Sequence, residues 1–148
     1  MIDKALGGTK QATARLHESN AINDLRVLSS AEATFSAVMG QGRYAAPEQL
    51  ADATLLKRLG TQPMLEAYFV QPVRQGYQFE FIGEKPDYLH GPLRVFGKVY
   101  ESFVYVAWPI DPGPEGRRTV ALYPDGQVFA TSEPRRVPTR EDELLGAR

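Results

Sequence analysis

The chain has 148 residues, of which 43% are hydrophobic and 24% are charged, so it is long enough for one domain with a buried core. A net charge of −1 supplies no general positive field for nucleic acid or anionic lipid, and we expect no nucleic-acid partner. The absence of cysteine excludes disulfide bonds, cysteine nucleophiles and zinc–thiolate sites. Neither a membrane span nor a signal peptide is visible, so we expect membrane contact only through a segment absent from this sequence.

Residues 1–9 are expected to be a short leader or an expression remnant, with a break at the pair Gly7 and Gly8 before the next helix. The following stretch, 10–39, contains neither proline nor glycine, which predicts one long spine helix. Its second half carries apolar residues at steps of three and four, which form one face: Ile22, Leu25, Leu28, Ala31, Phe35 and Val38. The run 10–20 is mostly polar, so we expect the chain's own core to cover only the second half of the helix.

Residues 40–75 are predicted to be a connector folded over the core. Pro47 suits the first turn of a short helix, and Pro63 is expected to open another helical turn over 62–69. Gly60 follows Lys57 and Arg58 and is expected to end the first of these helices.

From Gly76 the apolar period changes from 3.6 to 2, which predicts a sheet over 76–131. Four antiparallel strands are expected, at about 77–82, 99–108, 117–123 and 127–131. The second strand is apolar on both faces and should be central, and residues 84–92 are predicted to be a loop. The predicted fold class is therefore α+β, with one long N-terminal helix packed on a roughly four-stranded antiparallel sheet.

Residues 132–148 are polar and contain Pro134 and Pro138, which oppose regular strand pairing. We expect an unpaired C-terminal tail there. The alternative is a capping box formed by Thr139 and Asp142 at the start of a last helical turn.

Four segments share patterns with one protein family. Residues 18–38 read ESNAINDLRVLSSAEATFSAV, 42–60 hold GRYAAPEQL and then LLKRLG, 74–81 read RQGYQFEF, and 108–129 read WPIDPGPEGRRTVALYPDGQVF. In this order they resemble the spine helix, the αβ-loop and the sheet strands of type IV pilins and type II secretion pseudopilins. The resemblance implies a structural subunit of a cell-surface or periplasmic filament.

The chain departs from that family at its beginning. No prepilin-peptidase site and no long apolar half-helix precedes the spine. The resemblance thus implies either a head trimmed of its membrane half or a split pilin whose head docks on a short hydrophobic helical partner. Pseudopilins often bind calcium in the last loop, but the spacing of Asp111, Glu115 and Asp125 matches no calcium loop, and no metal or cofactor is expected.

Enzymatic chemistry is not predicted. His17 and His90 are far apart in sequence, without a clear carboxylate partner. The serines at 29, 30 and 36 lie on the predicted helix and not at a strand–turn–helix elbow, so no catalytic residue is assigned.

The leading hypothesis is a non-enzymatic subunit that assembles with copies of itself or with related pilins through its spine helix. Charges that would set the register between neighbouring spines are predicted at Arg15, Glu18, Asp24, Arg26 and Glu32. The alternative is a periplasmic or surface ligand-binding module that uses the loops 84–92 and 109–116 as a rim.

Overall fold

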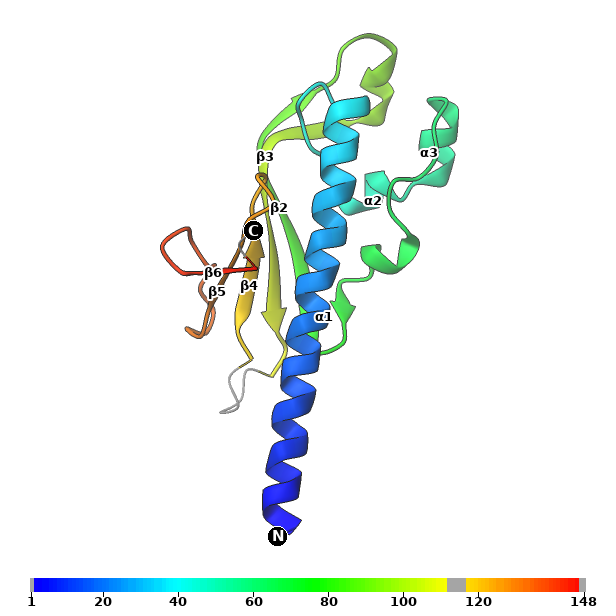
Figure 1. The fold of residues 1–148 in the computed structure, drawn as a ribbon. Helices are drawn as coiled ribbons and strands as arrows, with labels where there is room; N and C mark the ends of the chain where they lie inside the picture. Colours follow the sequence, from blue (N-terminus) through cyan, green and yellow to red (C-terminus); the bar gives the residue numbers. More distant parts are fainter. Residues whose placement is uncertain (1, 112–116, 147–148) are drawn as a thin grey trace.

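The computed structural model describes residues 2–111 and 117–146, and for residues 2–11 it describes the backbone alone (Figure 1). The described residues form one long helix lying across one face of a six-stranded antiparallel sheet, which is an α+β fold. The elements in chain order are α1 (Ile2–Val38), α2 (Pro47–Leu50), α3 (Ala53–Arg58), the 3-10 helix η1 (Ala67–Val70), β1 (Val73–Arg74), β2 (Tyr77–Tyr88), the 3-10 helix η2 (Gly91–Phe96), β3 (Lys98–Pro109), β4 (Thr119–Leu122), β5 (Val128–Thr131) and β6 (Glu143–Leu145).

Helix α1 is longer than predicted. It begins at Ile2 and continues through Gly7 and Gly8, so the expected break at this glycine pair is wrong. A glycine in a helix interior costs about 1 kcal/mol relative to alanine, but it keeps its backbone N–H and C=O, so it weakens the helix without ending it. The 37 residues span about 55 Å at 1.5 Å per residue. In Figure 1 the first part of α1, drawn in blue, extends beyond the end of the sheet.

The sheet is a simple meander in which each strand pairs with the next, from β1 to β6. The central strand β3 is apolar on both faces, as predicted. Phe103 and Tyr105 face α1 in the main core, whereas Val104 and Val106 belong to a smaller apolar cluster on the other face. The main core is formed where the apolar stripe of α1 meets the first of these faces.

The predicted loop over 84–92 is wrong in its first part, because β2 continues to Tyr88 and pairs with β3 at every residue except Lys85, which has a positive φ. Pro86 lies within this strand, opposite Tyr100. The short strand β1 pairs with β2 only at Gln78 and Tyr77, so in the described residues the far half of β2 is a sheet edge. Proline is tolerated there because no second neighbour needs its missing N–H.

The C-terminal stretch is not an unpaired tail over the described residues 132–146. Strand β6 pairs with β5, and the hydroxyl of Tyr123 donates to the carbonyl of Pro138 at 2.6 Å. Of the alternative capping box one bond forms, from the backbone N–H of Thr139 to Oδ2 of Asp142 at 2.6 Å, whereas the Thr139 hydroxyl accepts from Glu141 N, and the segment is a turn and not a helix. Two ion-pair partners of Arg136, Asp142 and Glu133, fix the same turn, and Arg136 holds the pKa of Asp142 well below its usual range.

The connector is less helical than predicted. The helix that starts at Pro47 ends at Leu50, and a second begins at Ala53 with Asp52 as its N-cap, whose side chain accepts from Leu55 N at 3.0 Å. Gly60 adopts a positive φ just after α3, as expected for a helix stop. The turn expected near Pro63 forms later, as η1.

We expect Gly83→Ala to destabilise the fold by about 1–3 kcal/mol, because strand pairing brings a ring over this glycine. A Cβ at Gly83 would lie 2.4 Å from Cδ1 of Tyr100, whose ring also contacts Phe81. The free energy of unfolding in urea measures the loss, with Glu84→Ala as the exposed neighbouring control. An unchanged value in Gly83→Ala would show that the Tyr100 ring moves aside freely.

Candidate functional site

The five predicted assembly charges do not form one surface. Arg15 and Arg26 are exposed on α1. Glu18 and Asp24 lie at the sides of the helix, where each accepts from an arginine of the same chain, and Glu32 is buried. The structure therefore separates two exposed cations from three acids that bind within the head.

Glu32 lies on the buried face of α1 and is 1% exposed. Its Oε1 accepts from the backbone N–H of Ala45 at 3.0 Å, and its Oε2 accepts from the hydroxyl of Tyr105 at 2.8 Å. Burial raises the pKa of Glu32 to about 8, although both hydrogen bonds act in the opposite direction. The prediction of an exposed charge at Glu32 is wrong, because this carboxyl joins α1 to the connector and to β3 in the interior.

Arg74 was not predicted to be part of a site, yet it is the most buried cation among the described residues, at 4% exposure. Its Nε donates to Oδ2 of Asp24 at 3.0 Å, and its Nη1 donates to the carbonyls of Phe69 and Gln71 at 3.0 and 2.6 Å. The guanidinium carbon lies 3.8 Å from the ring centre of Phe79, and Nη2 has no hydrogen-bond partner among the described residues. One side chain thus joins α1, the connector and β2.

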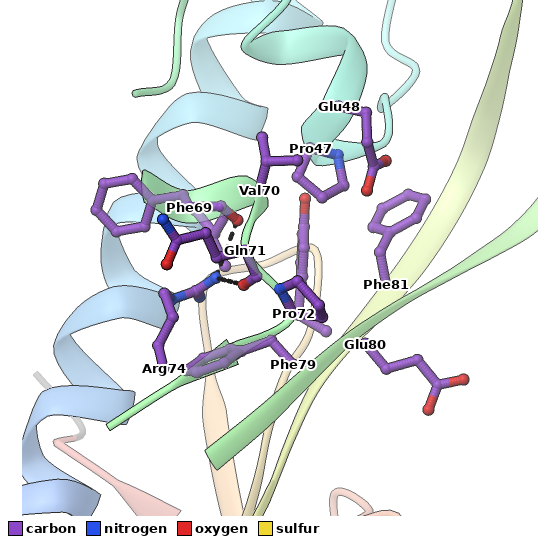
Figure 2. A pocket seen from close by; sticks show the side chains of 12 residues that line it. Pro47, Glu48, Phe69, Val70, Gln71, Pro72, Arg74, Phe79, Glu80 and Phe81 are labelled. Carbon is purple, nitrogen blue, oxygen red and sulfur yellow. Dashed lines mark hydrogen bonds between the residues drawn. The ribbon is translucent and has the colours of Figure 1, made fainter. Parts of the chain in front are cut away.

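A pocket of about 260 Å³ lies next to this arginine, between the connector residues 69–72 and strand β2 (Figure 2). Its walls are mostly apolar, with Phe69, Phe79, Phe81 and Tyr105 among them. Glu80 contributes to the wall, but Figure 2 shows its side chain directed away, and its carboxylate accepts from Trp108 Nε1 at 3.1 Å. The other acid in the wall is Glu48 on α2, and no histidine, serine or threonine lines the pocket among the described residues.

A second set of polar contacts lies where α1 leaves the sheet. Arg118 donates to Glu18 on α1 at 2.7 Å and also pairs with Glu143 on β6. On the other side of the helix the amide of Asn20 donates to the side chain of Gln75. These contacts fix the helix to the residue that precedes β4 and to the turn between β1 and β2, at the level beyond which α1 projects.

The acidic residues that the sequence analysis considered for calcium binding do not form a metal site among the described residues. The described residues contain no group of three or more His, Asp or Glu side chains arranged to hold a metal ion. Asp125 is paired with Arg140 at 2.8 Å, and Glu115 lies outside the described residues. Of the two loops of the predicted ligand rim, residues 84–88 of the first belong to β2, and residues 112–116 of the second lie outside the described residues.

Comparisons with protein-family models, with curated proteins and with solved structures found no match to this chain. Within the described residues, no helix combines the length and apolar character required to cross a bilayer.

We expect Arg74→Ala to lower the free energy of unfolding by about 3–5 kcal/mol, because it leaves the half-buried Asp24 carboxylate without its cation and frees two connector carbonyls. Arg74→Lys keeps the charge but not the planar fork, so it should recover less than half of this loss. Urea unfolding followed by circular dichroism measures both variants. Arg26→Ala, at an exposed position of the same helix, should change stability by less than about 0.5 kcal/mol.

We expect the stability of the fold to fall as pH rises from about 5 to about 8, by up to about 1.4 kcal/mol per pH unit. In this window the unfolded chain releases the Glu32 proton, since its ordinary pKa is 4.5, while the folded chain retains it. Glu32→Gln keeps an acceptor for Ala45 and a donor for Tyr105 and should remove most of this slope. Urea unfolding across this pH range tests it, with Glu101→Gln as the exposed control; equal slopes in wild type and Glu32→Gln would contradict the assignment.

Proposed function

We propose that this chain is a structural, non-enzymatic subunit of a type IV pilus or a type II secretion pseudopilus. The proposal rests on the way in which α1 is packed. Its second half packs against the sheet, whereas its first part extends beyond the sheet (Figure 1). In such a filament the projecting helices form the core and the sheets face outward. When one surface of a subunit binds a different surface of the next, the contact repeats, and it builds an open helical polymer if the rotation does not close into a ring.

The sequence patterns described above support this proposal together with the order of the elements, one long helix followed by a connector and an antiparallel meander. The partners are other copies of the chain or related pilins, with a short hydrophobic helical chain as the membrane-bound partner in a split arrangement. The filament lies at the cell surface or in the periplasm.

Immunogold electron microscopy of the source cells tests this function. Antibodies raised against the folded head should label extended filaments or an envelope-spanning assembly, and deletion of the gene should remove them. Complementation with the full chain should restore the labelled structures. Label confined to the cell interior, or filaments unchanged after deletion, would contradict the proposal.

A further inference from the structure

The exposed side of α1 is unusually poor in charge. Between residues 12 and 38 its exposed positions include two charged residues, Arg15 and Arg26, and no acid. Leu16 and Val27 lie on this side and are 59% and 42% exposed. A helix face that only meets water normally carries many charged side chains, whereas the centres of protein interfaces are depleted of charge.

A groove of about 560 Å³ adjoins Val27, between α1 and the connector. Its lining is apolar except for Glu66, and it includes Met64, Leu65 and Phe69. Glu66 is exposed and takes part in no ion pair among the described residues. The groove thus combines an apolar floor with one negative charge.

The complementary surface lies on the same helix, next to its projecting part. Leu16 is a large exposed apolar side chain, and the adjacent Arg15 is an exposed cation without an ion-pair partner among the described residues. Leu16 and Val27 belong to one straight helix and are about 16 Å apart along its axis. The Arg15–Leu16 turn therefore cannot reach the groove of its own chain, and any occupant of this kind comes from another molecule.

We propose that the Arg15–Leu16 turn of a second copy of this chain docks in the groove, with Leu16 against Val27 and Arg15 facing Glu66. This inference rests on the proposed function, because it names the surface through which neighbouring subunits meet. The turn and the groove are different surfaces of the same chain, so the contact is heterologous in a parallel arrangement and isologous in a two-fold, antiparallel one. If the helices are parallel, each added copy leaves one turn and one groove unoccupied, so further copies can be added. If the helices are antiparallel, the turn of each copy fills the groove of the other, and the assembly stops at a dimer.

Site-specific crosslinking tests the contact, since the chain has no cysteine of its own. Ala12→Cys lies one helical turn before Leu16, and Ala67→Cys lies in the groove wall. The chain carrying both cysteines should give oligomers with a short bismaleimide. The matched control carries Ala12→Cys with Ser132→Cys, an exposed position outside the groove, and should give little product.

Charge exchange in the cysteine-bearing chain tests the pairing of Arg15 with Glu66. Arg15→Glu or Glu66→Arg alone should reduce the crosslinked fraction up to about fivefold, and the combined exchange should restore it. Both positions are exposed, so the melting temperature of each variant should equal that of the parent. A double exchange no better than the single ones, or equal yields from the groove pair and the control pair, would overturn the groove contact.

The same gel separates this inference from the proposed function. A ladder of trimers and longer products supports the groove contact and an open polymer. Dimers alone support the groove contact but count against a filament built through it. A monomer at every protein concentration overturns the groove contact, while filaments labelled in cells would still uphold the proposed function.

Discussion

The rest of the head is built against one face of α1, where Leu25, Leu28 and Phe35 are wholly buried. Full burial of one such side chain contributes about 1.5–3 kcal/mol, which is a large share of the 5–15 kcal/mol that typically separates folded from unfolded domains. The inner face of β3 supplies the opposing wall through Phe103 and Tyr105. Helix α1 covers this face together with the connector, whose Leu50 and Leu56 belong to the same core, so the position of α1 determines which side of β3 faces the main core.

Apolar contact alone leaves a helix free to turn or slide, and three acids of α1 remove that freedom. Glu18 binds Arg118, Asp24 binds Arg74, and Glu32 binds the backbone of Ala45. The three contacts lie at successive levels of the helix and lead to the end of the sheet, to β1 and to the connector. They also explain the charge of the exposed face, since the acids act within the chain while Arg15 and Arg26 remain outside.

The parts of this fold that can be predicted from the sequence are those in which apolar residues recur at a regular spacing. The stripe from Leu25 to Phe35 and the two-sided apolar pattern of β3 were both sufficient to place their elements. The errors arise where tertiary contacts override local signals. Strand β6 has only three residues and depends on β5 for its pairing, and the buried state of Glu32 depends on partners 13 and 73 residues away, at Ala45 and Tyr105. The spacing from Leu28 and Phe35 places Glu32 on the apolar face, but no local pattern indicates which distant groups bind its carboxyl.

The candidate site shows the same division between features set by local sequence pattern and features set by tertiary contacts. The sequence analysis assigned all five spine charges to one role, although the apolar stripe already marked the covered face and Glu32, four residues after Leu28 and three before Phe35, lies on that face. Once the covered face is known, the exposed face is fixed as well, and its lack of acids becomes visible.

The projecting part of α1 depends on the packed half for its helical form. A helix segment of this length is marginal by itself in water, and two glycines within it cost about 1 kcal/mol each. Its helical form is continued from the packed half, which removes the cost of nucleation, so a surface that covers it adds directly to its stability.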